Sequence, residues 1–264
     1  MNRDIKAILF DLDDTLMVEM ACERASFLTA CELAEKRRKV DVEELYDAIF
    51  RRARELWEGS KDFQFCEKIG FAFFEGLWST FEGNAPAMKR LRRWAPTYRR
   101  KAWRLALKDA GVEDDALADA LSERYQRERR KRHVLFDETL GALEDLRADY
   151  RLGILTNGAE DIQRSKIDGA GLSEYFDTIV ITGALGVGKP HPRSYMAALE
   201  ALSAGPAETA MVGNNLERDI QGAKKAGLFT VWLNRGDAVR HDNIRPDVEI
   251  RHLTDIREAL TPVE

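Results

Sequence analysis

The sequence predicts an α/β protein, with a Rossmann-like parallel sheet core and an inserted all-helical cap domain. The first observation is an apolar segment at residues 5–10, which is typical of a strand covered on both faces. The second is the lack of any strand pattern from about residue 17 to residue 133. The third is a regular alternation of helical and strand patterns from residue 137 onward. We therefore expect a sheet domain made of residues 1–16 and 134–264, and a helical cap made of residues 17–133.

Helical spacing marks the inserted segment. Pro86 suits the start of a helix, and Pro96 suits an interruption of the same segment. Asp114 begins a further helix that leads into a basic stretch. One apolar helix face is the clearest, and its residues are Val42, Leu45, Ile49, Ala53 and Leu56.

The C-terminal half reads as repeated strand–helix–strand units. Such units form right-handed crossovers between parallel strands, and the first strand of the chain joins the same sheet. The expected strands are residues 152–155, 178–181, 210–212 and 229–232. The expected helices are residues 140–146, 161–170, 194–202 and 219–226.

Composition excludes several classes of protein. The net charge of −5 argues against a dedicated nucleic-acid binder. The three cysteines form no Cys-x-x-Cys pair, and we expect reduced, mostly buried thiols. Residues 5–10 are too short for a secretory signal, and no segment has the roughly 18 apolar residues that span a bilayer. We expect a cytoplasmic protein with no membrane partner.

Two carboxylates follow the first strand at once, in the run Asp11-Leu12-Asp13. Like charges this close repel and raise one another's pKa unless a cation or a proton neutralises them. A divalent metal at the carboxyl end of a sheet strand explains the pair, because open α/β folds bind their ligands there. The alternative is an acidic turn that caps the next helix.

Other expected strands also end in polar residues. Thr156 and Asn157 follow the second strand, and Lys189 lies in the loop after the third. Asn214 and Asp219 follow the fourth. If the strands are neighbours in a parallel sheet, these side chains meet the two N-terminal aspartates in one crevice.

These residues form four motifs in order, and they resemble the motifs of the haloacid dehalogenase (HAD) superfamily, in its phosphatase branch. The resemblance covers the whole sheet domain. The four matching runs are Asp11-Leu12-Asp13-Asp14-Thr15, Thr156-Asn157, Lys189-Pro190 and Gly213-Asn214-Asn215-Leu216-Glu217-Arg218-Asp219.

The resemblance implies a Rossmann-like core with a helical cap, and a role for each motif residue. Asp11 is then the nucleophile that forms an aspartyl-phosphate, and Asp13 is the general acid and base. Lys189 neutralises Asp11 and the transferring group. The Thr156 hydroxyl and the Asn157 backbone amide hold phosphoryl oxygens.

The same resemblance implies Mg²⁺ as cofactor, bound by Asp11, the backbone carbonyl of Asp13 and the fourth motif, at Asn214 and Asp219. Family members often carry aspartate where Asn214 stands, so this chain has one negative charge fewer at the site. The implied substrate is a small phosphorylated metabolite, such as a nucleotide, a flavin phosphate or a sugar phosphate.

Other activities stay open. A phosphonate hydrolase of this superfamily needs a Schiff-base lysine in the cap, for which Lys61 and Lys68 are candidates. A haloacid hydrolase is a further alternative, but in that branch the position of Asp13 is not an acid. Asn214 also leaves room for a non-catalytic binding or regulatory protein. The sequence leaves the oligomeric state open.

Two further segments have competing interpretations. Gly183 to Lys189 matches the spacing of a nucleotide-binding P-loop, but Pro190 replaces the Ser or Thr that binds Mg²⁺. Residues 84–108 contain nine basic residues and no acid, with Trp94, Tyr98 and Trp103 interleaved. That segment is either a charged lid for a polyanionic substrate or, as we favour, a helix with a solvated basic face and aromatic core anchors.

Overall fold

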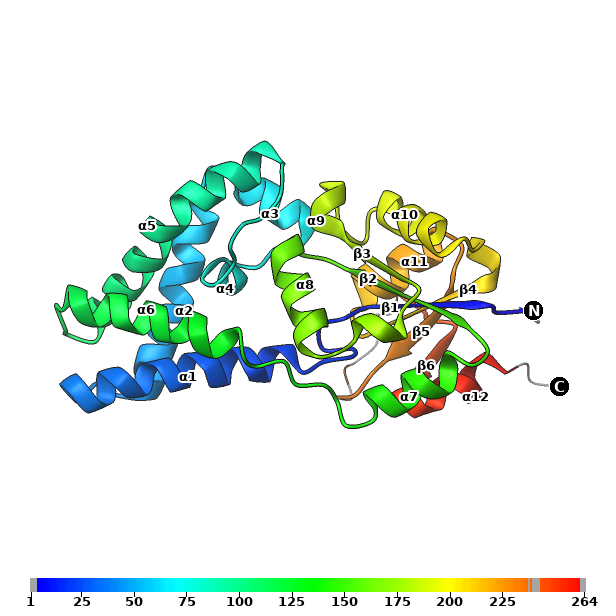
Figure 1. The fold of residues 1–264 in the computed structure, drawn as a ribbon, viewed down its shortest axis with the longest axis horizontal. Helices are drawn as coiled ribbons and strands as arrows, with labels where there is room; N and C mark the ends of the chain where they lie inside the picture. Colours follow the sequence, from blue (N-terminus) through cyan, green and yellow to red (C-terminus); the bar gives the residue numbers. More distant parts are fainter. Residues whose placement is uncertain (1–3, 237, 239–242, 262–264) are drawn as a thin grey trace. The chain divides into compact units, whose positions relative to one another are not determined.

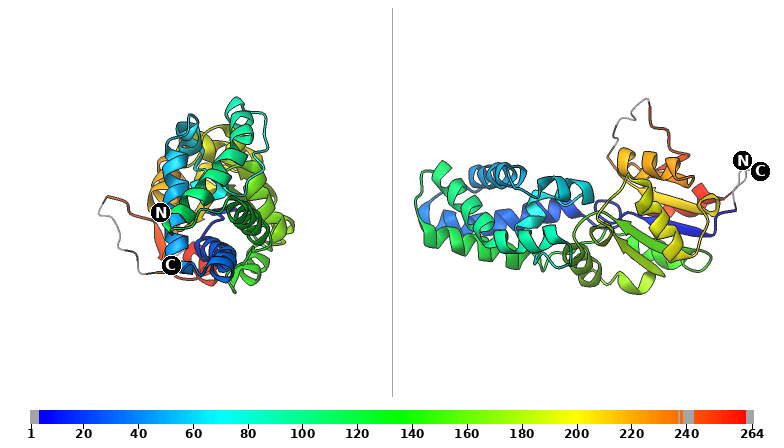
Figure 2. Two further views of the ribbon diagram at one scale, coloured as in Figure 1. Left: turned by 90° about the vertical axis from the view of Figure 1, so that its left-hand side faces the viewer. Right: turned by 90° about the horizontal axis from the view of Figure 1, so that it is seen from above.

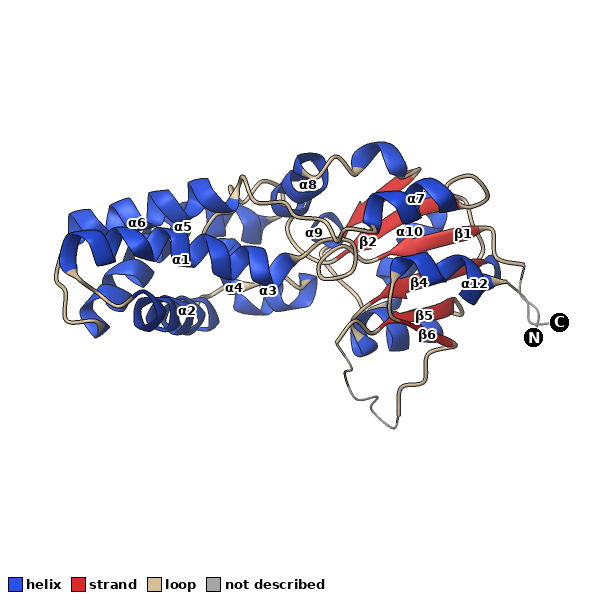
Figure 3. Ribbon diagram, turned by 90° about the horizontal axis from the view of Figure 1, so that it is seen from below, coloured by secondary structure: helices blue, strands red, loops and turns tan. Residues whose placement is uncertain are grey.

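The computed structural model describes residues 4–236, 238 and 243–261 (Figure 1). Its contacts divide the chain into two compact units. The sheet unit comprises residues 1–18, 134–157 and 167–264, and the helical unit comprises residues 19–133 and 158–166. The predicted parallel sheet with an all-helical insertion is confirmed, and Figure 3 shows the named strands in the sheet unit alone.

The sheet unit contains six parallel strands in the order β3-β2-β1-β4-β5-β6. These strands are β1 (Ala7–Phe10), β2 (Arg151–Thr156), β3 (Thr178–Ile181), β4 (Thr209–Gly213), β5 (Phe229–Leu233) and β6 (Val248–Ile250). Its helices and helical turns are α7 (Thr139–Leu146), η1 (Ser173–Tyr175), α9 (Thr182–Leu185), α10 (Pro192–Leu202), η2 (Pro206–Glu208), η3 (Leu216–Gln221), α11 (Gly222–Lys225), η4 (Leu253–Asp255) and α12 (Ile256–Leu260).

Strand β1 lies inside the sheet and is buried on both faces, as its unbroken apolar sequence predicts. Successive side chains of a strand point to opposite faces. Ile8 and Phe10 therefore pack with α7 and α12, while Ala7 and Leu9 pack with α10 and α11. The five strands expected from the sequence all form, and β6 is a sixth that we did not predict.

The helical unit has its own apolar core. Its elements are α1 (Glu19–Arg38), α2 (Val42–Glu58), α3 (Phe63–Ile69), α4 (Phe73–Gly76), α5 (Pro86–Asp109), α6 (Asp115–Arg129) and most of α8 (Glu160–Gly169). Helices α1 and α6 run side by side (Figure 2). Helix α8 follows β2 in the chain, yet Ala159 and Ile162 belong to the core of the helical unit.

The basic segment forms one continuous helix, α5. Pro96 does not interrupt it, contrary to expectation, because a proline removes only one backbone N–H and this one lies on the exposed side. Trp103 and Tyr98 are buried in the core, as aromatic anchors. Several basic side chains of α5 pair with acids of neighbouring segments, namely Arg90 with Asp62, Arg100 with Asp119, and Arg104 with Asp115.

A cluster of buried charges joins α1, α4, α6 and α8. Arg129 donates to Glu19 at 2.5 Å and to Glu23 at 2.7 Å. Lys166 lies 3.0 Å from Glu19 and 2.9 Å from Glu75. These side chains are at most 5% exposed. Lys166 therefore attaches α8 to the helical unit.

Cys22, Cys31 and Cys66 are buried thiols with no disulfide. Among the described residues, no helix is both long and apolar enough to cross a membrane.

Candidate active site

Strand order brings the predicted motifs to one edge of the sheet. Phe10, the last residue of β1, pairs with Ile154 of β2 on one side and Val212 of β4 on the other. Because the strands are parallel, Asp11, the end of β2 and the turn after β4 follow at the same edge. The sheet unit thus supplies every residue of the candidate site.

Lys189 is the centre of the site. Its Nζ donates to Asp11 Oδ1 at 2.6 Å and to Asp219 Oδ1 at 2.8 Å, and all three residues are buried. Burial alone would lower the pKa of Lys189, but the two carboxylates outweigh burial and hold that pKa above its ordinary value. Lys189 therefore remains a cation beside Asp11 at neutral pH.

Burial raises the pKa of the Asp11 carboxyl above its ordinary value, although the Lys189 ammonium acts in the opposite direction. The charge of Asp219 adds to the rise. The side chain of Asp11 is 12% exposed, so one part of it is open to a ligand. A buried carboxylate next to a fixed cation at a strand end is typical of a catalytic group.

Asn157 holds the segment that carries Lys189. Its Oδ1 accepts from the Lys189 backbone N–H at 2.7 Å, and its Nδ2 donates to the Lys189 carbonyl at 2.9 Å. Gly188 makes this approach possible, since a Cβ there would lie 2.6 Å from Asn157 Oδ1. The sequence had indicated only the backbone amide of Asn157, and this side-chain contact was missed.

Thr15 is a further residue that sequence reasoning missed. It is fully buried, and its Oγ1 donates to Asp11 Oδ2 at 3.2 Å. The Asn214 backbone N–H donates to the same Oγ1 at 3.2 Å, and Asn214 Oδ1 lies 3.4 Å from it. Thr15 thereby brings the amide oxygen of Asn214 close to the Asp11 carboxylate. Its position in the first motif was the available signal.

Asp219 is held as a partner of Lys189. Its second oxygen, Oδ2, accepts from the Asn215 backbone N–H at 2.9 Å. It belongs to η3, a π-helical turn, a form that often occurs at functional sites. Gly213 is required here, because a Cβ at that position would lie 2.4 Å from Asp219 Cγ. Both carboxylate oxygens of Asp219 thus accept hydrogen bonds from the protein.

Asp13 and Thr156 also lie at this edge of the sheet. Asp13 is half-buried and lies in a tight turn after β1. In this turn Asp14 adopts a φ of 56°, and the Asp14 backbone N–H donates to the Met17 carbonyl at 2.8 Å. Thr156 is the buried last residue of β2. The structure thus places the predicted site residues together at one edge, with Asp11, Lys189, Asp219 and Asn214 joined directly or through Thr15.

The oxygen atoms at this edge suit a hard divalent cation. Mg²⁺ is usually bound by one or two carboxylates together with waters and substrate phosphate. Asp11 Oδ2 and Asn214 Oδ1 both lie beside Thr15 Oγ1, so two oxygens that can bind metal face the same point. In the part of the chain that the structure describes, no group of three His, Cys, Asp or Glu side chains forms a metal cluster. A magnesium site here would rest on one carboxylate, an amide oxygen and a backbone carbonyl.

The loop that resembles a P-loop does not act as one. Residues 183–185 belong to the helical turn α9, and Lys189 is bound to two carboxylates. A P-loop lysine instead contacts the phosphates of a nucleotide. The structure agrees with the rejection of that motif.

Comparison with known proteins finds matches that cover most of the chain. A family model described as haloacid dehalogenase-like hydrolase matches residues 5–227. The phosphoserine phosphatase of Thermus thermophilus is 36% identical over 253 residues, which cover 96% of this chain and 98% of that protein. The N-acylneuraminate-9-phosphatase of Mus musculus is 28% identical over 238 residues, covering 89% of this chain and 85% of that protein.

A solved structure of a family member also matches nearly the whole chain. A 2-haloacid dehalogenase from Pseudomonas syringae superposes with a TM-score of 0.61 at 26% identity, and the match covers 97% of this chain and 98% of that one. The family predicted from the four motifs is thus confirmed, and with it the prediction of a hydrolase.

Proposed function

The chain belongs to the haloacid dehalogenase-like hydrolase family, and from this premise we propose that it is a Mg²⁺-dependent phosphatase of small phosphomonoesters. The observation that carries the proposal is Lys189 Nζ held between Asp11 and Asp219, with the half-buried acid Asp13 two residues after Asp11 in the chain. This arrangement supplies a nucleophile, a fixed cation and an acid at one strand edge.

In the first step Asp11 attacks phosphorus. One oxygen of the Asp11 carboxylate forms the new bond, and Lys189, which lies 2.6 Å from Oδ1, offsets the charge of the carboxylate and the phosphoryl group. The bond between phosphorus and the leaving oxygen breaks, and Asp13 donates a proton to that oxygen. The product is an aspartyl-phosphate on Asp11 and a free alcohol.

In the second step water attacks the same phosphorus. Asp13, now a carboxylate, takes the proton of the water, and the bond between Asp11 and phosphorus breaks. Inorganic phosphate leaves and Asp11 is restored. The Thr156 hydroxyl and the Asn157 backbone N–H bind phosphoryl oxygens in both steps, while Lys189 offsets their charge.

Asp11, the backbone carbonyl of Asp13 and Asn214 would hold Mg²⁺, which when bound neutralises charge on the phosphoryl group. Asp219 then contributes through Lys189, because its two oxygens already accept hydrogen bonds from Lys189 and Asn215. This assignment favours Asn214 over Asp219 as the fourth-motif metal ligand.

The relatives indicate which substrates to test first. The names of the two phosphatase relatives favour phosphoserine and N-acylneuraminate 9-phosphate as the first compounds to test. Nucleotides, flavin mononucleotide and sugar phosphates complete the panel. A cytosolic location, suggested by the three unpaired cysteines, stays a prediction.

The test is phosphate release from this panel with and without Mg²⁺, by the wild-type protein and by Asp11→Asn. We expect turnover that requires Mg²⁺ and Asp11. Turnover that survives the Asp11 substitution would refute the mechanism, and no turnover on any ester would favour a binding protein.

A haloacid hydrolase is the second candidate, because the dehalogenase from Pseudomonas syringae shares this fold at 26% identity. Chloride release from 2-chloropropionate tests it. A single turnover in isotopically labelled water separates the two reactions. Attack of water on phosphorus labels the phosphate, whereas hydrolysis of a carbon ester of Asp11 labels the Asp11 carboxylate.

A further inference from the structure

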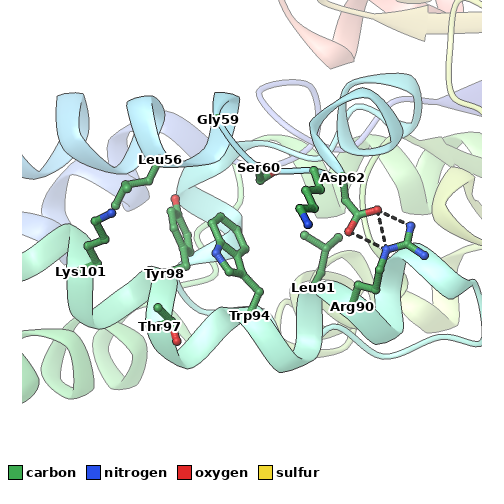
Figure 4. Close-up of a pocket in the computed structure, with 11 residues that line it drawn as sticks. Leu56, Gly59, Ser60, Asp62, Arg90, Leu91, Trp94, Thr97, Tyr98 and Lys101 are labelled. Carbon is green, nitrogen blue, oxygen red and sulfur yellow. Dashed lines mark hydrogen bonds and ion pairs between the residues drawn. The ribbon is translucent and has the colours of Figure 1, made fainter.

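The helical unit contains a cavity between α2, the turn after α2 and helix α5 (Figure 4). Its volume is 420 Å³, which falls within the range of about 300–1,000 Å³ that small-molecule sites occupy. Every lining residue belongs to the helical unit, so the cavity shares no side chain with the Asp11 site.

Helix α5 supplies a rigid aromatic wall. Leu91, Trp94, Tyr98 and Lys101 are three or four residues apart and therefore lie on one face of the helix. The rings of Trp94 and Tyr98 stack with centroids 4.6 Å apart. The Tyr98 hydroxyl donates to the Phe73 carbonyl at 2.8 Å, which fixes its ring.

Trp94 is accessible where the other tryptophans are not. Of the five tryptophans, Trp94 alone is half-buried, and the remaining four are at most 2% exposed. Leu56 of α2 also lines the cavity (Figure 4). A flat ring can thus bury apolar surface here without displacing the core.

The charge of the cavity is positive. Its carboxylate, Asp62, is neutralised by Arg90, whose Nε lies 3.0 Å from Asp62 Oδ2. Lys61 and Lys101 are exposed, and neither forms an ion pair with a residue that the structure describes. Two cations therefore remain at the opening without a protein counter-charge, and they favour an anionic ligand.

A polar group in the lining also lacks a partner. Ser60 Oγ is buried and makes no hydrogen bond within the described part of the chain. Buried hydroxyls almost always have a partner in the protein or its bound ligands. The hydroxyl of Ser60 is therefore available to a bound molecule.

We propose that this cavity binds a small anion that carries a flat ring, of the aromatic carboxylate class. The ring packs against Trp94 and Leu56, and the anionic group pairs with a lysine of the lining, Lys61 or Lys101. The site is independent of the proposed phosphatase site, because it uses no residue of the sheet unit.

The test is isothermal titration of the full-length protein with indole-3-acetate, its neutral isostere indole-3-acetamide, and acetate. We expect one saturable site for indole-3-acetate, and an affinity about tenfold lower for the amide, which lacks the charge. Acetate alone should not saturate.

The variant is Lys61→Met with Lys101→Met, and the matched control is Lys89→Met, an exposed lysine of α5 outside the lining. The double variant should bind indole-3-acetate no better than the amide, while Lys89→Met should bind it as the wild type does. Circular dichroism verifies that the variants are folded.

Any one of the following results would overturn the proposal. Indole-3-acetate fails to bind, or it binds no better than the amide, or the double variant leaves its affinity unchanged. Displacement of the probe by inorganic phosphate with Mg²⁺ would also overturn the proposal, since that competitor belongs to the Asp11 site.

Discussion

Among the described residues, each unit contains a cluster of buried charges, and the two clusters share a design. In the sheet unit Lys189 lies between Asp11 and Asp219, at 2.6 and 2.8 Å. In the helical unit Lys166 lies between two glutamates, at 3.0 and 2.9 Å. The two lysine side chains are 1% and 0% exposed.

The two clusters differ in the exposure of their acids, so we call the cluster of the helical unit the closed cluster and that of the sheet unit the open cluster. In the helical unit the glutamates are at most 5% exposed, and a second cation, Arg129, adds two ion pairs. In the sheet unit the Asp11 side chain is 12% exposed, and Asp13 and Asn214 are half-buried. An ion pair whose acids are fully buried is thus structural. A buried ion pair becomes reactive when one carboxylate oxygen remains accessible to a ligand at a strand end.

The largest expected effect is on turnover. Lys189→Met removes the cation that orients Asp11 and offsets the phosphoryl charge, so kcat should fall by about a thousandfold. Steady-state phosphate release on the best substrate of the panel measures it. A kcat near that of the wild type would contradict the role of Lys189.

The matched change in the other cluster should act on stability. Lys166→Met leaves its two glutamates with fewer counter-charges, so the free energy of unfolding should fall by roughly 3–5 kcal/mol. Denaturant unfolding of the full chain measures it. If the folded variant instead loses kcat as Lys189→Met does, the distinction between the clusters fails.

A smaller loss of turnover should follow from Asn157→Ala. The substitution removes both hydrogen bonds that hold the Lys189 backbone, so the ammonium becomes less well positioned and kcat should fall by about a hundredfold. The same assay measures it, with KM as a second readout. An unchanged kcat would show that the Lys189 segment is held in some other way.

Glu23 should make the closed cluster sensitive to pH. Burial raises the pKa of Glu23 from 4.5 to about 7, although Arg129 acts in the opposite direction. The folded state therefore binds a proton at Glu23 more readily than the unfolded state does. Stability from this group is present below pH 4.5 and lost as the pH rises through about 7.

Unfolding free energies of wild type and Glu23→Gln at several pH values test this sign. The wild type should lose on the order of 2 kcal/mol that the variant retains. Parallel curves for the two proteins would mean that Glu23 is ionised throughout.

The smallest effect concerns the open cluster. Asn214→Asp replaces the amide of a proposed Mg²⁺ ligand with a carboxylate, so the Mg²⁺ concentration for half-maximal activity should fall by about tenfold. Titration of activity against Mg²⁺ measures it. A requirement that does not change would place the metal away from Asn214.

The residues of the open cluster could be predicted from sequence because the topology of the sheet places them together. Parallel strands end at one edge, so Asp11, Lys189 and Asp219 had to meet once the strands were recognised. The contacts within the edge could not be predicted. Whether an amide such as Asn157 uses its backbone or its side chain depends on the path of a loop, and no periodic pattern reports that path.

The closed cluster was not predicted at all. Glu19 and Arg129 are 110 residues apart, and each lies in a helix rich in charged residues that looks like a solvated surface. Strand β6 has three residues, too few for a periodic signal.

The peptide bond between Asn157 and Gly158 has a consequence for domain engineering. The division of the chain falls at this bond, and the Gly158 N–H donates to the Ile69 carbonyl at 2.9 Å within the helical unit. A graft cut only at residues 18 and 134 would leave the recipient without the segment 158–166. Such a chimaera would lack Lys166 and expose the apolar surface that Ala159 and Ile162 cover. The helical unit is therefore transferable only as two pieces of sequence, joined through a strand of its host.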